Sequence, residues 1–268
     1  MAMSHTRATL LAMCVGLWPI AAHAVDEIQV YNGEIAQPGK FTLQQHLNYA
    51  INGRKEPEFP GGLVPHHALN GTPELAYGVT NWYEVGLYAP FAINSDSQFL
   101  SNGFKVRHLF VVPNADQRNF FYGVNFEFSV NYHYWEDRHI TSEVRPIVGF
   151  HLKPIDIIFN PIMDTNWTGG FGNLEFVPST RLAYNINDKY AVAGEWYSDF
   201  GTFHQFAPAA DQFHELWAVL DHTGKYLNIE TGIGFGVTPG ADKVTFKLML
   251  SRDLNHPKGE AAAQLHER

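Results

Sequence analysis

The stretch from residue 119 to residue 134, NFFYGVNFEFSVNYHY, decides the fold class. Its even-numbered residues, from Phe120 to Tyr134, are all aromatic or valine, whereas its odd-numbered residues are mostly polar or glycine. Only Phe121 interrupts this period of two residues, at which a β-strand places successive side chains on opposite faces. The stretch therefore predicts one long strand with an apolar face and a polar face.

The same alternation recurs along most of the chain. It is clear in residues 141–152, 173–184, 226–237 and 243–251. Weaker versions occupy residues 40–51, 73–79, 82–91, 103–112, 155–163, 189–199 and 213–221. No apolar stripe with the 3.6-residue period of a helix appears in the body of the chain. The pattern predicts an all-β protein of about twelve strands.

The connections between these segments alternate in length. Residues 80–81, 153–154 and 185–188 are short and turn-like, whereas residues 52–72 and 200–212 are long. Outer-membrane barrels show this alternation, with their short turns on the periplasmic side. An even number of strands also places both ends of a barrel on that side.

The composition excludes several classes of protein. The chain has 268 residues, a formal net charge of −9 and one cysteine. This net negative charge argues against a protein that binds nucleic acid, because such proteins carry a positively charged surface for the phosphates. A single cysteine excludes a disulfide scaffold and a cysteine-based zinc site. A mean hydropathy of −0.19 excludes a bundle of membrane helices, but it is compatible with a membrane barrel, whose polar lumen residues dilute the lipid-facing ones.

Two folds can carry such strands, and they differ in which face meets water. A soluble β-sandwich buries its apolar face, whereas a membrane barrel turns that face to lipid and its polar face inward. The expected strands run about 9–15 residues, close to the roughly 9–11 that a membrane strand needs and longer than the usual 5–6 of globular sheets. We therefore expect a transmembrane antiparallel up-and-down β-barrel at residues 40–254. A soluble periplasmic β-sandwich that binds a small molecule is the alternative.

The two ends of the sequence differ from the barrel segments. Arg7, the apolar run at residues 8–20 and the Ala22-His23-Ala24 sequence predict a signal peptide over residues 1–24 that is cleaved on export. Residues 25–39 are expected to form an N-terminal periplasmic segment, and residues 255–268 a polar periplasmic tail. The expected location is the outer membrane of a Gram-negative bacterium, with outer-membrane lipid and the barrel-assembly machinery as partners.

Residues 74–90, ELAYGVTNWYEVGLYAP, also carry a family resemblance. The residues concerned are Glu74, Tyr77, Gly78, Thr80, Glu84, Gly86 and Pro90. This hairpin resembles proteobacterial outer-membrane barrels of the transporter type, including the MetA-pathway phenol-degradation group. The resemblance implies an outer-membrane barrel that moves small organic molecules.

The sequence departs from that family at its C-terminal end. Such barrels commonly end in an aromatic residue on the last strand, which the assembly machinery recognises. Here the chain continues to Arg268 beyond the last expected strand. Phe246 and Leu250 are therefore the expected contacts for assembly within that strand.

If the apolar faces meet lipid, parity places one set of charged residues in the lumen. The candidates are Glu74, Glu84, Lys105, Arg107, Glu127, Glu143, Arg145, Asp156, Glu175, Arg181, Glu195, Glu215, Glu230 and Lys247. Carboxylates outnumber bases in this set, and a water-filled lumen of this charge should favour cations. The expected function is passive passage of small solutes, with small organic or aromatic compounds among the permeants. A barrel of this size filled by internal salt bridges, with no conductance, is the alternative.

No catalytic or metal-binding motif stands out. The chain lacks a GxSxG sequence, and its histidines and serines have no spacing that indicates a dyad. We expect no enzyme and no cofactor, although a barrel enzyme that acts on lipid stays an alternative. His66 and His67 lack a third ligand at a defined spacing, so no metal site is expected. The 53–71 stretch is expected to be a surface loop, with an inward constriction as the alternative, and the oligomeric state stays open.

Overall fold

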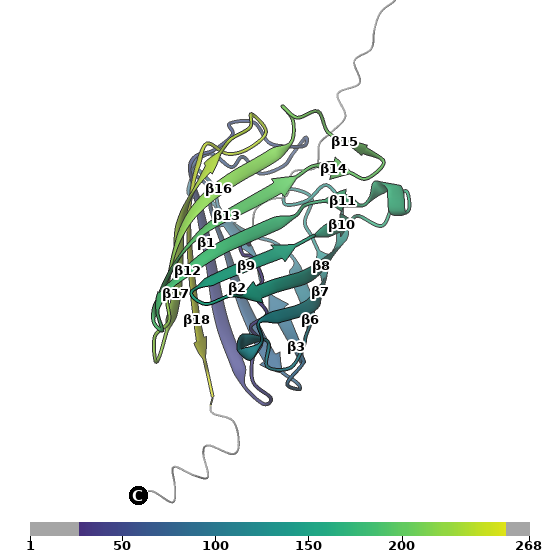
Figure 1. Cartoon of the computed structure of the whole chain (residues 1–268). Coiled ribbons are helices and arrows are strands. Elements are labelled where there is room, and N and C mark those ends of the chain that lie inside the picture. The colour runs from purple at the N-terminus through teal and green to yellow at the C-terminus, as the bar shows by residue number, and fades with distance from the viewer. Residues whose placement is uncertain (1–26, 256–268) are drawn as a thin grey trace, which may run out of the picture.

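A computed structural model describes residues 27–255 as a closed antiparallel β-barrel (Figure 1). The first nine strands are β1 (Phe41–Asn52), β2 (Leu69–Gly78), β3 (Tyr83–Tyr88), β4 (Phe91–Ile93), β5 (Phe99–Ser101), β6 (Phe104–Val111), β7 (Phe120–Val130), β8 (Ile140–His151) and β9 (Ile155–Asn160). The other nine are β10 (Met163–Thr165), β11 (Glu175–Phe176), β12 (Ser179–Asn187), β13 (Tyr190–Asp199), β14 (Gly201–Thr202), β15 (Gln205–Phe206), β16 (Phe213–His222), β17 (Asn228–Gly236) and β18 (Val244–Asp253). The expected signal peptide and residues 256–268 of the expected tail lie outside the described residues.

The eighteen strand elements make a wall of twelve strands. Short irregularities divide six of the twelve, because β4, β5, β10, β11, β14 and β15 extend the ends of β3, β6, β9, β12, β13 and β16. β1 pairs with β2 on one side and with β18 on the other, which closes the barrel. The expected all-β barrel of about twelve strands is confirmed.

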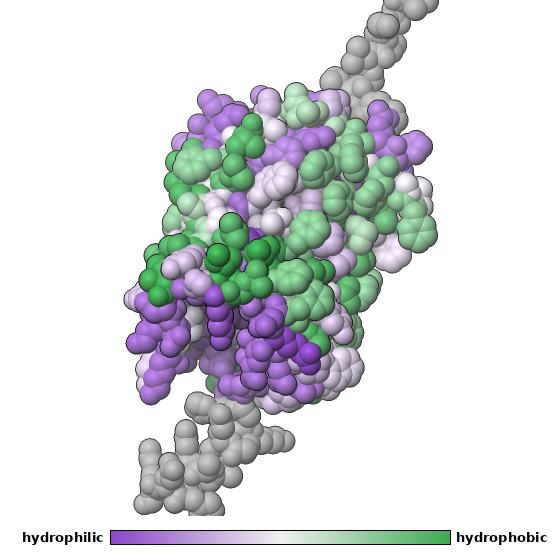
Figure 2. Space-filling model, in the orientation of Figure 1, coloured by the Kyte–Doolittle hydropathy of each residue, from purple (hydrophilic) through white to green (hydrophobic). Residues whose placement is uncertain are grey.

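The two faces of the wall have the polarity of a membrane barrel. On β7, Phe120, Tyr122 and Phe128 are 48%, 56% and 45% exposed, whereas Asn125 and Glu127 are 0% and 3% exposed. Figure 2 shows hydrophobic residues spread over the visible wall and hydrophilic residues at both ends of the barrel, most densely at the turn end, at the bottom of the view. This arrangement is the reverse of a soluble sandwich, so the sandwich alternative is wrong.

The two ends of the barrel differ in their connections. Residues 79–82, 152–154 and 188–189 form tight turns at one end, and the longer loops 53–68 and 131–139 lie at the other (Figure 1). One of the connections at the turn end carries a short 3-10 helix, η1 (Ala115–Gln117), and the loop after β10 carries another, η2 (Phe171–Asn173). Within residues 27–255, no helix is long and apolar enough to cross a membrane.

Residues 27–38, which we call the lumen segment, run through the inside of the barrel. At the turn end, the Gly39 backbone N–H donates to the Gly78 carbonyl at 2.8 Å. Further inside, Ile28 packs against Trp217 of β16, and Tyr31 packs in a core with Phe121 of β7. These contacts correct the expectation that the residues before the barrel form a periplasmic segment. The segment lies in the lumen because the wall offers it inward apolar side chains.

Candidate functional site in the barrel lumen

The charged residues expected in the lumen are all buried or half-buried, on the face opposite the exposed apolar residues. Nine are at most 6% exposed: Glu74, Glu84, Arg107, Glu127, Arg145, Arg181, Glu195, Glu215 and Lys247. The half-buried ones are Lys105, Glu143, Asp156, Glu175 and Glu230. Most belong to ion-pair clusters, and three of these clusters also hold the lumen segment.

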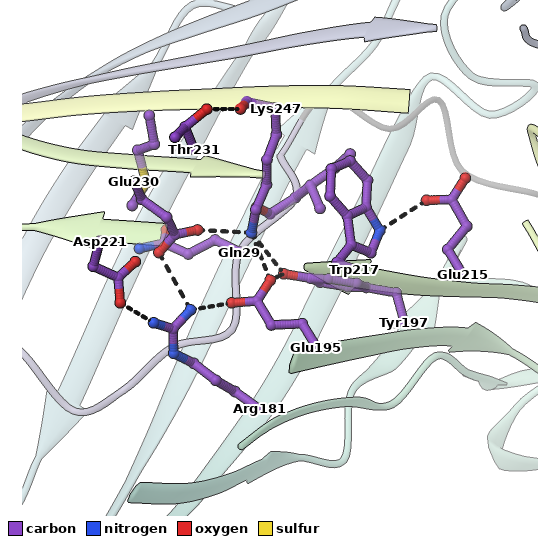
Figure 3. Close-up of polar contacts among 12 residues, drawn as sticks. Gln29, Arg181, Glu195, Tyr197, Glu215, Trp217, Asp221, Glu230, Thr231 and Lys247 are labelled. Carbon is purple, nitrogen blue, oxygen red and sulfur yellow. Dashed lines mark hydrogen bonds and ion pairs between the residues drawn. The ribbon is translucent and has the colours of Figure 1, made fainter. Parts of the chain in front are cut away.

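The first cluster, which we call the Arg181 cluster, consists of Arg181, Glu195, Asp221, Glu230 and Lys247 (Figure 3). The Arg181 guanidinium contacts the carboxylates of Glu195, Asp221 and Glu230. Lys247 Nζ lies 2.5 Å from Glu195 and 2.7 Å from Glu230. Its ammonium also donates to the Ile28 carbonyl at 3.3 Å, which ties β18 to the lumen segment.

Asp221 was not among the residues expected in the lumen. It has the same parity as Glu215 on β16, so the two side chains share a face. The expected strand ended at residue 221, and terminal positions of a strand are the hardest to assign. The parity rule applied to the last residue of that strand would have found it.

Arg107 of β6 forms the second cluster with Glu74 and Glu84. Its guanidinium lies 2.5 Å from the Glu74 carboxylate and donates to Glu84 as well. It also donates to the Tyr31 hydroxyl at 3.2 Å. Glu84 in turn accepts the backbone N–H of Ala36 at 2.6 Å. One guanidinium therefore joins two wall strands to the lumen segment.

Arg145 of β8 makes the third connection. It donates to both oxygens of the Glu143 carboxylate, at 2.6 and 2.8 Å, and to the Gln29 carbonyl at 3.0 Å. Its guanidinium carbon lies 4.3 Å from the centre of the Tyr31 ring, within the range of a cation–π contact. The Tyr31 hydroxyl donates to Glu127 at 3.1 Å. Parity predicted these charges, but not their contacts with the lumen segment.

The lumen segment leaves a cavity at each end of the barrel. The turn-end cavity has a volume of about 720 Å³, and its wall includes Glu84, Arg107, Arg181 and Asp221. The loop-end cavity has a volume of about 160 Å³. Gln29 lines both, so the cavities meet the lumen segment from opposite sides. The lumen segment at Gln29 therefore lies between the two cavities.

The loop-end cavity is strongly acidic. Its charged lining residues are Glu27, Glu127, Glu136, Glu143, Asp164, Glu175, Asp199, Glu215, Lys105 and Arg145. Trp135, Ile162, Tyr197 and Phe213 contribute apolar surface to the same wall. The turn-end cavity is closer to balance, with eight carboxylates and five Lys or Arg residues.

The first long loop folds over the loop end of the lumen. The Leu63 backbone N–H donates to the Tyr134 carbonyl at 2.9 Å, and Ala68 is buried. Phe59 and Leu63 line a third cavity, of about 50 Å³, together with Trp135. The stretch therefore packs against the loop end of the barrel, with the third cavity beneath it.

The paired histidines of that loop pack against each other. The rings of His66 and His67 stack with their centroids 3.9 Å apart. Within residues 27–255, no group of three or more His, Cys, Asp or Glu side chains is arranged to hold a metal ion. The positions of these two side chains are explained by packing between the rings.

Comparisons with known proteins identify the fold. No family model matches the chain, and no curated protein matches it. An outer-membrane channel from Pseudomonas putida F1 is 11% identical, with a TM-score of 0.61 over 85% of this chain and 100% of that chain. The KdgM porin is 9% identical, with a TM-score of 0.52 over 80% and 99%. The NanC porin is 11% identical, with a TM-score of 0.50 over 80% and 100%.

At these identities the similarity concerns the fold, and that fold is an outer-membrane β-barrel. All three matches cover essentially the whole of the other chain, so the likeness extends around the barrel and is not confined to one hairpin. The narrower resemblance to the MetA-pathway group stays a prediction.

Proposed function

We propose that this chain is a passive channel of the Gram-negative outer membrane, through which small solutes diffuse without a catalytic step. The exposed apolar wall supports the location, because a surface of this kind is stable against lipid and not against water. The similar solved structures, which include an outer-membrane channel and two porins, support the same role.

The observation that carries the proposal is the pair of cavities on opposite sides of the lumen segment. A barrel filled only for structural reasons has no need of 720 Å³ of space at one end and 160 Å³ at the other. A solute that moves from one cavity to the other has to pass the layer at residues 28–31. We propose that this layer sets the size limit of the channel.

The charge of the two cavities favours cations. Carboxylates outnumber Lys and Arg eight to two in the loop-end cavity and eight to five in the turn-end cavity. A wall of carboxylates raises the local concentration of cations and lowers that of anions. Uncharged small aromatic compounds are further candidate permeants, on the strength of the hairpin resemblance alone.

Single-channel recording in planar bilayers tests the proposal. The protein is expected to conduct, and its reversal potential in a salt gradient should show a preference for cations. A folded barrel without conductance would instead support the filled structural barrel, which the three clusters on the lumen segment also favour. Swelling of proteoliposomes in small uncharged aromatic alcohols would then test the second class of permeant.

A further inference from the structure

Glu215 of β16 is a deeply buried carboxylate that forms no ion pair among the described residues. It is 2% exposed, and its carboxylate accepts a hydrogen bond from the Trp217 indole N–H at 3.0 Å. Within residues 27–255, no Lys, Arg or His forms an ion pair with it, and Arg54, which lines the smaller cavity with it, is paired with Asp242. By contrast, Glu74 contacts Arg107, and Glu195 contacts both Arg181 and Lys247. In Figure 3, Glu215 lies apart from the Arg181 cluster, on the far side of Trp217.

A buried carboxylate without a counter-charge is costly, so in folded proteins such a group either stays protonated or pairs with a cation. Glu215 lines both the loop-end cavity and the smaller cavity under loop 53–68. The missing positive charge can therefore come from a ligand that occupies the loop-end cavity.

The wall of that cavity indicates what kind of cation it takes. Trp135, Ile162 and Phe213 line it together with the carboxylates, and Trp135 is only 4% exposed. Indole and phenyl faces attract cations and cover apolar groups, so the wall suits a ligand that has both. A bare metal ion would leave this aromatic surface unused.

The volume limits the size of the ligand. One water requires about 10–15 Å³ of cavity volume, so the loop-end cavity, of about 160 Å³, holds on the order of ten water molecules. A ligand of about ten non-hydrogen atoms would replace them.

We infer that the loop-end cavity binds a small organic ammonium ion. The ammonium group of this ligand pairs with the Glu215 carboxylate, and its apolar part packs against Trp135 and Phe213. The other carboxylates of the wall draw the cation into the cavity. The inference rests on the proposed function in one respect, because the ligand has to enter the cavity from the outer side of the channel.

The test compares three probes of nearly the same size on the full exported chain, folded in detergent. Calorimetry measures the affinity for 2-phenylethylamine, for the uncharged 2-phenylethanol and for the anionic phenylacetate. The amine is expected to bind at least ten-fold more tightly than the alcohol, and phenylacetate more weakly still. Equal affinity for the amine and the alcohol would overturn the inference.

Glu215→Gln should remove the preference for the amine over the alcohol and leave the affinity for the alcohol nearly unchanged. Asp156→Asn is the matched control, because Asp156 lines only the turn-end cavity and should leave the preference intact. Loss of the preference in both variants would mean that net charge, and not Glu215, selects the amine. Heat-modifiable migration on a denaturing gel checks that each variant is folded.

A second variant keeps the inference testable if Glu215→Gln does not fold. Trp135→Leu should weaken binding of 2-phenylethylamine at least five-fold and leave the much weaker binding of ammonium chloride unchanged. If ammonium chloride or sodium chloride competes as effectively as the amine, the site is an inorganic cation site and the inference is wrong.

These measurements are independent of conductance. A barrel that binds the amine without conducting would overturn the proposed function and leave the binding site standing. A barrel that conducts cations without any preference for the amine would overturn only the binding site.

Discussion

The Asn160 side-chain amide of β9 binds the backbone of Tyr31 on both sides. Its Nδ2 donates to the Tyr31 carbonyl at 3.1 Å, and its Oδ1 accepts the Tyr31 backbone N–H at 2.7 Å. Both residues are at most 4% exposed. The amide thus substitutes for a neighbouring strand and fixes the lumen segment at the middle of the barrel.

Asn160→Ala should therefore weaken the attachment of the lumen segment to the barrel wall. It removes both partners of a buried backbone N–H and carbonyl, and each unsatisfied group costs about 1–3 kcal/mol. Urea-dependent folding into lipid vesicles should show a lower free energy of unfolding. Asn119→Ala, at an exposed position of the turn end, should have no measurable effect. An unchanged stability for Asn160→Ala would mean that these two bonds do not hold the segment.

The two faces of β7 should respond differently to substitution. Phe128 is 45% exposed on the outer face, and Phe128→Arg should cost roughly 2–4 kcal/mol if it lies near the bilayer midplane. Glu127→Gln should cost less, because the amide can still accept a hydrogen bond from Tyr31. Folding titrations in lipid vesicles measure both values. Equal tolerance of the two changes would contradict the assignment of faces.

Removing one base from the Arg181 cluster should lower the free energy of unfolding more than removing that base together with one of its acidic partners. Arg181→Met leaves Asp221 and part of Glu195 without a counter-charge, at a cost of about 3–5 kcal/mol. Adding Asp221→Asn should restore part of that stability. The free energies of unfolding of the single and double variants give the comparison, and a double variant less stable than Arg181→Met alone would count against this description of the cluster.

Cation preference should depend on the loop-end cavity. Replacement of Glu127, Glu143 and Glu175 by Gln removes three of its carboxylates and should move the reversal potential toward zero. The matched control replaces Asp96 and Asp137, which lie in exposed loops, by Asn. If both sets of changes move the potential equally, the selectivity does not arise in this cavity.

The strands and their faces could be predicted because each depends on a local pattern of period two. Phe121 interrupts the pattern on the polar face, and only the folded barrel explains why a phenylalanine occupies this position. It is fully buried, and its ring lies where a Cβ on Gly149 would be 2.1 Å away and a Cβ on Gly33 2.7 Å away. Two glycines distant in sequence make room for this ring, so no local pattern could explain it.

The lumen segment was placed wrongly for a related reason. Its contacts span long distances in sequence, such as the 129 residues between Tyr31 and Asn160. One signal was present in the wall: Trp217 and Val219 are apolar yet share the inward face of β16 with Glu215. Inward apolar residues next to inward charges indicate that something apolar packs inside. Here it is Ile28.

The path of the lumen segment also bears on the order of events during biogenesis. The segment precedes β1, so the ribosome makes it before every strand of the wall. Two of its contacts, however, come from later strands: Asn160 of β9 binds Tyr31, and Lys247 of β18 binds the Ile28 carbonyl. Because β18 is also the strand that closes onto β1, the segment acquires its full set of contacts only when the cylinder shuts. A region that is synthesised early is thus among the last to acquire all of its native contacts.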